Sequence, residues 1–362
     1  MSKQKHLMIA AAGTGGHVMP GLAVAQEMQA RGWTVSWIGT TTGMESRLVA
    51  SYGLEFDALE FTGMRGKGLG HMLKGAVKLI KACFKSKDLV DARDADAVFS
   101  TGGYIAVPAA YGARRENIPL VMMNCDADSL MSVRAVMPWA DAVMCGFDGE
   151  CAHRAGAKAI VSGNPVRAEI LALPQPQQRY ENRTGPLNIL VFGGSLGAKV
   201  LNETLPKTLA KFSPECRPNV VHQCGRNAVD AVKALYAEVG VEADVVAFID
   251  DMAGAYAKAD LVVCRAGATS VSELTAAGVP AILVPFVVST TQHQLGNARF
   301  MQSHEAGILI EQKDLTPDSL FETIQGLDRE ALVKMGENAR RLAHREAAKT
   351  VADVIERLVD KE

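Results

Sequence analysis

The sequence predicts an α/β protein with two Rossmann-like domains, each built on a parallel sheet and facing the other across a cleft. At 362 residues the chain is longer than one hydrophobic core usually organises. Short β-branched runs alternate with helical patterns, and this alternation stops at a polar, proline-rich stretch and then starts again. The composition, 48% apolar and 22% charged residues, is typical of a globular protein, and a net charge of −2 excludes nucleic acid as an overall polyelectrolyte partner.

The first half contains short apolar runs that we interpret as buried strands. Strands of a parallel sheet are covered on both faces, so they are apolar throughout rather than alternating. The segments between them space their apolar residues as helices do. We expect strands at residues 7–12, 35–38, 97–100, 120–123 and 142–145, and helices at 22–31 and 44–52 among the connections.

Residues 173–186 are polar and rich in proline, and we interpret them as the linker between domains. From Asp328 onward the apolar residues keep a helical period, and we expect the last helix to pack on the first domain. The second half repeats the α/β alternation, with expected strands at residues 187–192, 220–223, 245–249, 261–264, 282–286 and 308–310.

The cysteines and the apolar segments bear on the cellular compartment. There are seven cysteines, an odd number, without a Cys-x-x-Cys pair, which favours a reducing cytoplasm over a disulfide framework or a metal site. The apolar run at residues 7–12 is too short for a signal peptide, and the stretch 276–288 is interrupted by Pro280 and Pro285. We therefore expect any membrane contact to be peripheral.

A glycine loop, Gly13–His17, follows the first predicted strand and precedes a helix. An open α/β sheet presents backbone N–H groups to ligands at this position. The loop is not a dinucleotide fingerprint, because the third glycine of G-x-G-x-x-G is missing and no acid ends the second strand. A purely structural turn is the alternative, but His17 adds a group that titrates near neutral pH.

Two further loops occupy equivalent places in the second half. Gly193–Ala198 follows its first strand and is small enough for a diphosphate or a sugar to approach the backbone. Arg265–Glu273 follows a later strand and opens a helix near Thr269, whose N-terminus can hold a diphosphate. Glu273 then lies where a carboxylate can accept from both hydroxyls of a ribose. The alternative is a capping box, with Ser270 as N-cap and Glu273 at the third helical position.

The three loops belong to a longer series of motifs along the chain. The series is Gly13–His17 with Pro20–Ala23, Gly63–Gly68, Gly102–Tyr104 with Pro108, Gly163–Arg167, Gly193–Ala198, Phe248–Met252 and Cys264–Glu273. Taken together, these motifs resemble the MurG family of N-acetylglucosamine transferases, and the resemblance covers nearly the whole chain. It implies the two-domain GT-B fold, with an acceptor- and membrane-facing domain at residues 1–166, onto which a terminal helix at about 344–362 packs, and a donor domain at 167–343.

The resemblance implies that this chain moves N-acetylglucosamine from UDP-N-acetylglucosamine to undecaprenyl-pyrophosphoryl-linked muramyl-pentapeptide in peptidoglycan synthesis, inverting the anomeric centre. It places Ile249 on the uracil, Glu273 on the ribose and Gln294 on the sugar. It also implies substrate-binding roles around the diphosphate for Arg167, Ser195, Ala268, Thr269, Ser270, Val271 and Ser272, and on the acceptor side for Thr14, Gly15, Gly16, Arg65, Lys67, Tyr104 and Asp126.

We expect the chemistry to need neither a cofactor nor a metal. UDP leaves as an anion, and helix N-termini together with Arg167 can stabilise the developing charge. His17 is the candidate general base for the acceptor hydroxyl. The alternative is that His17 only caps or orients its loop.

Residues 65–87 are basic without an acid, and the expected helix from His71 has lysines on one face and apolar residues on another. Such a surface suits an anionic membrane, whereas an ordinary solvated helix is the alternative. With the resemblance, it implies a peripheral protein at the cytoplasmic face of the bacterial membrane. The basic residues are Arg65, Lys67, Lys74, Lys78, Lys81, Lys85 and Lys87.

The chain departs from the family at two places. The fifth strand usually ends in His-Glu-Gln-Asn, but the matching residues here are Met123, Asn124, Cys125 and Asp126. The acids that commonly precede the His293–Gln294 pair are replaced by residues 289–292, Ser-Thr-Thr-Gln. A transferase with another acceptor and a donor-binding protein with weak catalysis therefore stay open, as, more distantly, does a UDP-sugar epimerase.

Overall fold

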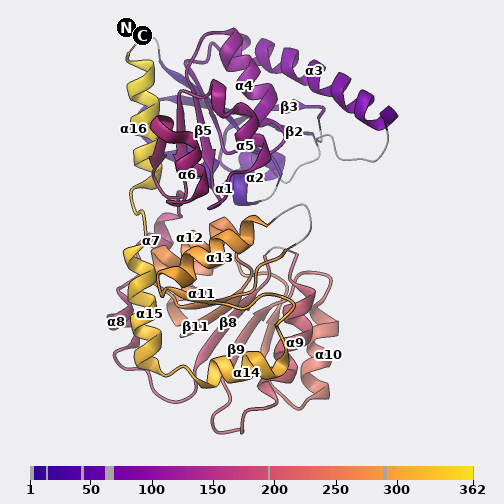
Figure 1. Cartoon of the computed structure of the whole chain (residues 1–362), viewed down its shortest axis with the longest axis vertical. Coiled ribbons are helices and arrows are strands. Elements are labelled where there is room, and N and C mark those ends of the chain that lie inside the picture. Colours follow the sequence, from indigo (N-terminus) through magenta and orange to yellow (C-terminus); the bar gives the residue numbers. More distant parts are fainter. Residues whose placement is uncertain are drawn as a thin grey trace. The chain divides into compact units, whose positions relative to one another are not determined.

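The computed structural model describes residues 4–13, 15–41, 45–61, 69–194, 196–287 and 292–361 (Figure 1). The chain forms two compact units. Unit 1 comprises Met1–Val166 and His344–Glu362, and unit 2 comprises Arg167–Ala343. Each unit contains one parallel sheet, so the expected class, two Rossmann-like α/β halves, is confirmed.

Unit 1 is built on a seven-stranded parallel sheet in the order β3-β2-β1-β4-β5-β6-β7. Its central strands are buried along their length, as expected for strands covered by helices on both faces. The strands are β1 (His6–Ala10), β2 (Thr34–Thr40), β3 (Glu55–Leu59), β4 (Ala97–Ser100), β5 (Leu120–Asn124), β6 (Ala142–Cys145) and β7 (Ala159–Val161).

The helices of unit 1 are the crossover connections of this sheet, with one addition from the end of the chain. In α3 the residues Ala82, Ser86 and Val90 are buried, and the latter two lie against Gly112 of α4. The helices are α1 (Gly15–Ala30), α2 (Glu45–Ser51), α3 (Leu69–Ala92), α4 (Ala106–Arg115), α5 (Met131–Val136), α6 (Glu150–Ala155) and α16 (Ala347–Val359), with short 3₁₀ turns at Met137–Trp139 and Gly156–Lys158.

Helix α16 follows unit 2 in the sequence but packs against α1 of unit 1 (yellow in Figure 1). Val351 and Ile355 are fully buried on its inner face. On its outer edge the carboxylate of Glu356 accepts hydrogen bonds from Arg31 at 2.6 Å and from the indole N–H of Trp33 at 3.2 Å.

Unit 2 is built on a six-stranded parallel sheet in the order β10-β9-β8-β11-β12-β13. The strands are β8 (Asn188–Phe192), β9 (Asn219–Gln223), β10 (Asp244–Val246), β11 (Leu261–Cys264), β12 (Ala281–Leu283) and β13 (Gly307–Leu309). The helices are α7 (Ala168–Leu171), α8 (Pro176–Tyr180), α9 (Lys199–Leu209), α10 (Val229–Glu238), α11 (Met252–Lys258), α12 (Ala268–Ala277), α13 (His293–Ser303), α14 (Pro317–Gln325) and α15 (Arg329–Arg341).

Most predicted strands are present, but two were missed. Strand β3 has the sequence Glu-Phe-Asp-Ala-Leu, in which two acidic residues interrupt the apolar run by which the other strands were recognised. Strand β7 is only three residues long. The first helix was predicted to begin at residue 22 and begins at Gly15, because the glycine loop leads directly into it. Within the described residues, no helix is both long and apolar enough to cross a membrane.

The prediction of a linker at residues 173–186 is wrong, because this stretch is an integral part of unit 2. The ring of Tyr180 is buried in the core, and its hydroxyl donates to the carbonyl of Asp260. The guanidinium of Arg183 donates to the buried carboxylate of Asp260 at 2.5 Å. Arginine and tyrosine side chains thus anchor a segment whose composition is typical of a loop.

Candidate active site

In each unit, the glycine loops lie at the point where the strand order reverses. In unit 1, β1 pairs with β2 on one side and with β4 on the other. In unit 2, β8 pairs in the same way with β9 on one side and with β11 on the other. Loops at the carboxyl ends of such strand pairs diverge and leave a crevice for a ligand. The loops Gly13–His17, Gly193–Ala198 and Arg265–Gly267 all follow these strands.

His17 is held in one tautomer by the loop after β4. Its Nδ1 lies 2.9 Å from the carbonyl oxygen of Thr101, so Nδ1 carries the proton and donates. The hydroxyl of Thr101 donates in return to the carbonyl of His17 at 2.9 Å. The neutral ring therefore carries its lone pair on Nε2, the atom that a general base needs.

The turn beside His17 requires glycine. Gly103 has φ +78°, and a Cβ there would lie 2.9 Å from the carbonyl oxygen of Ala12. The next residue, Tyr104, packs edge-on against Phe61 with ring centroids 6.3 Å apart. Tyr104, in the loop after β4, thus contacts a residue that follows β3.

The departure at the end of β5 has a structural basis. Met123 is fully buried within the strand and Asp126 is 7% exposed in the loop that follows. The amide of Asn124 donates to the carbonyls of Asp126 at 2.5 Å and Asp128 at 3.1 Å, and its oxygen accepts from the N–H of Leu130 at 3.0 Å. Asn124 thus organises the loop that presents Asp126.

In unit 2, α12 begins at Ala268 after the N-cap Gly267, which forms no side-chain cap. The alternative of a capping box at Ser270 is therefore wrong: Ser270 lies inside the helix. The amide of Asn297 donates to the carbonyl of Ala266 at 3.0 Å and holds the turn before the helix. The N–H of Val271 donates to the carbonyl of Gly267 at 2.9 Å, so the helix leaves the N–H groups of Ala268–Ser270 and the positive end of its dipole for a ligand.

The hydroxyl of Thr269 supports a ligand site at this helix end. Its oxygen is buried and, within the described residues, has no hydrogen-bond partner. A buried polar atom without a partner is destabilising unless a ligand or water completes it. A bound diphosphate would supply acceptor oxygens at this place.

Glu273, one turn into α12, is the most strongly constrained acid of the site. It is 7% exposed, and its Oε1 accepts from Nε and Nη2 of Arg167 at 3.2 and 2.9 Å. Its Oε2 accepts from the hydroxyl of Tyr256 at 3.2 Å. Burial raises the pKa of Glu273, and the charge and hydrogen bonds of Arg167 and the hydroxyl of Tyr256 oppose that rise.

Three further residues lie in the predicted donor loops of unit 2. The guanidinium of Arg265 donates to the carbonyl of Val284 at 3.1 Å and to the side-chain oxygen of Gln312 at 2.8 Å. Ile249 lies in the loop between β10 and α11, and Gln294 accepts from the backbone N–H of Phe286 at 2.8 Å. The contacts of Arg265 and Gln294 fix the loop after β12.

The second glycine loop rests on a buried polar network. Gly197 has φ +74°, and a Cβ there would collide with the carbonyl oxygen of Cys224. The amide of Asn202 donates to that same carbonyl at 3.1 Å and accepts from Nε2 of His222 at 3.1 Å, while Nδ1 of His222 lies 3.0 Å from the hydroxyl of Tyr236. Burial lowers the pKa of His222 to about 4.

Several predicted residues lie outside the part of the chain that the structure describes: Thr14, Arg65, Lys67 and Ser195. Gly15 and Gly16 form the first turn of α1. The described residues contain no cluster of three or more His, Cys, Asp or Glu side chains that could hold a metal ion. Sequence reasoning missed Tyr256, Asn202, His222 and the structural role of Asn297, because only their contacts in space connect them with the loops.

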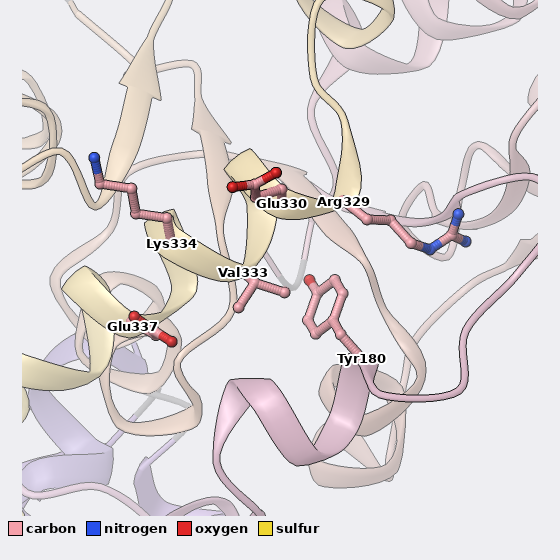
Figure 2. A pocket seen from close by; sticks show the side chains of 6 residues that line it. All are labelled: Tyr180, Arg329, Glu330, Val333, Lys334 and Glu337. Carbon is pink, nitrogen blue, oxygen red and sulfur yellow. The ribbon is translucent and has the colours of Figure 1, made fainter.

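A hollow of about 380 Å³ lies elsewhere in unit 2, between α8 and α15. Figure 2 shows the ring of Tyr180 facing Val333, with the charged ends of Arg329 and Lys334 pointing apart. Arg329 donates to the carbonyls of Gly185 and Pro186. None of the predicted site residues lines this hollow, and its charged groups do not converge on a ligand.

Family models match both halves of the chain. The N-terminal domain of glycosyltransferase family 28 matches residues 7–145, and the C-terminal domain of the same family matches residues 188–358.

Individual relatives match over nearly the full length. The chain is 53% identical over 364 residues to a UDP-N-acetylglucosamine–N-acetylmuramyl-(pentapeptide) pyrophosphoryl-undecaprenol N-acetylglucosamine transferase of Methylibium petroleiphilum, covering 99% of each chain. It is 49% identical to a protein of the same description from Janthinobacterium sp., covering 98% of this chain and 99% of that one. The crystal structure of Acinetobacter baumannii MurG superposes with a TM-score of 0.83 at 37% identity, covering 98% and 99%.

The network beneath the second glycine loop predicts a pH dependence of stability. The unfolded chain takes up a proton at His222 near its ordinary pKa of about 6.5, whereas the folded chain resists it until about pH 4. The contribution of neutral His222 to the free energy of unfolding is therefore fully present above about pH 6.5. It falls by about 2 kcal/mol on acidification to about pH 4.5. Urea unfolding across this range measures the loss.

The variant His222→Gln cannot take up that proton, so its stability changes less with pH than that of the wild type. The surface variant His153→Gln serves as control and keeps the wild-type slope. Equal slopes for the wild type and His222→Gln contradict the prediction.

Proposed function

Because the chain belongs to glycosyltransferase family 28, as the two family models together show, we propose that it transfers N-acetylglucosamine from UDP-N-acetylglucosamine to a lipid-linked muramyl-pentapeptide. This is the reaction that the names of its relatives describe, at 53% and 49% identity over nearly the full length. It places the chain in peptidoglycan synthesis, as a hexosyltransferase. The epimerase alternative has no support among these relatives.

The buried pair of Glu273 and Arg167 at α12 is the observation that supports donor binding most directly. A carboxylate that is 7% exposed can accept from a ribose hydroxyl in a place where water competes poorly. The N–H groups of Ala268–Ser270 at the start of α12 and the guanidinium of Arg167 suit the diphosphate. We assign the uracil to the loop at Ile249 and the sugar to Gln294.

The proposed transfer is a direct displacement that inverts the sugar. The acceptor hydroxyl oxygen forms a bond to the anomeric carbon while the bond from that carbon to the β-phosphate oxygen breaks. The hydroxyl proton passes to Nε2 of His17, and UDP leaves with the electron pair. The Thr101 carbonyl supports this role, because it accepts from Nδ1–H and stabilises the imidazolium that forms.

Two alternatives concern the acceptor side. The residues at Met123–Asp126 differ from the family pattern, and this favours either a different acceptor or slower catalysis. Replacing Asn124 with the family's glutamate is not a neutral restoration, because a carboxylate cannot donate to the carbonyls of Asp126 and Asp128. We therefore propose that Asn124 and the loop it holds recognise the acceptor together with Tyr104, Gly15 and Gly16.

The decisive assay incubates the purified protein with UDP-N-acetylglucosamine and undecaprenyl-linked muramyl-pentapeptide. We expect one UDP released for each disaccharide formed. His17→Ala should lower kcat by about 10²- to 10⁴-fold, since a positioned base contributes about that much, and leave donor affinity within about twofold.

The control is His153→Ala, a surface histidine of the same unit, which should keep wild-type kcat. UDP release without a disaccharide, or donor binding with neither product, contradicts the proposed reaction. An unchanged kcat in His17→Ala contradicts the role of the base.

We further propose that α3 carries unit 1 to an anionic membrane surface at the cytoplasmic side. Its buried face packs on α4, whereas Val77, Ile80 and Phe84 are 47%, 56% and 54% exposed. Lys78, Lys81 and Lys85 are also exposed on this helix. Lys87 differs from the expectation of a free basic face, because it pairs with Glu116 at 2.9 Å. Apolar side chains framed by lysines are typical of an interfacial helix.

The double variant Ile80→Glu/Phe84→Glu should bind phosphatidylglycerol vesicles at least about tenfold more weakly in co-sedimentation, because it loses apolar insertion and adds repulsion. The control Lys349→Ala/Arg357→Ala changes the net charge by the same amount on another exposed helix of unit 1. It should retain most binding. Equal losses in both variants indicate attraction by net charge alone and contradict the assignment to α3.

A further inference from the structure

Tyr256 is a buried tyrosine that connects several parts of the donor site in unit 2. Its side chain is fully buried, and its hydroxyl donates to Oε2 of Glu273 at 3.2 Å. Its ring packs edge-on against Phe192, the last residue of β8 before the glycine loop, with centroids 6.3 Å apart. Its carbonyl accepts from Arg179 at 3.2 Å. Helix α11, which carries Tyr256, also follows the loop of Ile249.

The two oxygens of the Glu273 carboxylate have different partners. Oε1 accepts from Arg167, a cation that a bound diphosphate also attracts. Oε2 accepts from Tyr256, whose neutral hydroxyl is not drawn from the carboxylate by the charge of a diphosphate. Of these two partners, the tyrosine hydroxyl can therefore hold the carboxylate in the same orientation before and after the donor binds.

We propose that Tyr256 is a positioning residue for ribose recognition, acting through Glu273. By holding Oε2 it keeps the carboxylate turned so that its remaining acceptor position meets a ribose hydroxyl. A carboxylate has about four such positions, enough for its protein partners and a ribose hydroxyl. This inference rests on the proposed function and goes beyond it, because it names a residue that determines discrimination of ribose from deoxyribose without touching the nucleotide.

A purely structural role for the tyrosine is the competing explanation. The ring fills the core beside Phe192, and this packing does not involve the hydroxyl. Tyr256→Phe keeps the ring and removes only the hydroxyl, so it separates the two explanations. Tyr236→Phe is a matched control, since Tyr236 is 3% exposed in the same unit and its hydroxyl contacts His222 rather than Glu273.

The experiment measures the affinities of UDP and 2′-deoxy-UDP by titration calorimetry. We expect the wild type to prefer UDP by about tenfold, the scale of a hydroxyl bonded to a charged acceptor. In Tyr256→Phe the preference should fall to about twofold, with the affinity for 2′-deoxy-UDP almost unchanged. Tyr236→Phe should keep the wild-type preference, even if its thermal stability falls.

The outcomes separate this inference from the proposed function. Equal weakening of both nucleotides in Tyr256→Phe, or an unchanged preference, overturns the positioning role while donor binding stands. A wild type that binds both nucleotides equally overturns ribose recognition by Glu273 and this inference with it. A wild type that binds neither contradicts the proposed donor itself.

A pH profile provides a second readout that a packing role does not move. The charged and titratable groups that act on Glu273 are Arg167 and Glu169 near α7 and Tyr256 on α11. Without the tyrosine hydroxyl, the pKa of Glu273 should rise further, so the carboxylate is protonated at a higher pH. As the pH is lowered, UDP affinity should therefore begin to fall at a higher pH in Tyr256→Phe than in the wild type or in Tyr236→Phe. Superimposable profiles contradict the inference.

Discussion

The candidate donor site of unit 2 depends on one buried carboxylate and on the partners that stabilise its anion. Glu273 is 7% exposed, and burial raises its pKa, so its neighbours must stabilise the anion. Arg167 comes from the start of the unit, Tyr256 from α11, and the first turn of α12 sets the place of the acid. The segment at residues 173–186 holds α11 and the end of α12 together, because Arg179 donates to the carbonyls of Tyr256 and Gly278.

The two units place different functional groups at the same kind of position in the sheet. Each uses the loops at a reversal of strand order, where backbone N–H groups and side chains can converge. Unit 1 places there an imidazole whose tautomer is fixed by the Thr101 carbonyl, which suits proton transfer. Unit 2 places there a helix N-terminus and a paired carboxylate, which suit a nucleotide diphosphate. The proposed assignment of the acceptor to unit 1 and of the donor to unit 2 thus rests on which residue types follow these strands.

Much of this could be predicted from the sequence, because strand patterns and glycine loops are local. Apolar runs located most strands, and the small residues after β11 indicated a helix N-terminus. The role of residues 173–186 could not be predicted, since their anchoring depends on Asp260 and Tyr256, which are distant in sequence. For the same reason Asn124 was interpreted only as a lost family residue, although its amide oxygen accepts from the N–H of Leu130 and holds the loop after β5.

The central claim is that the Glu273 carboxylate recognises the donor, and the most direct test is the affinity of Glu273→Gln for UDP-N-acetylglucosamine by titration calorimetry. A glutamine keeps the size of the side chain but loses the charge and one acceptor oxygen. We predict that affinity falls by about tenfold or more, the scale of a hydrogen bond to a charged group, while the variant remains folded by circular dichroism. An unchanged affinity in a folded variant would contradict the account.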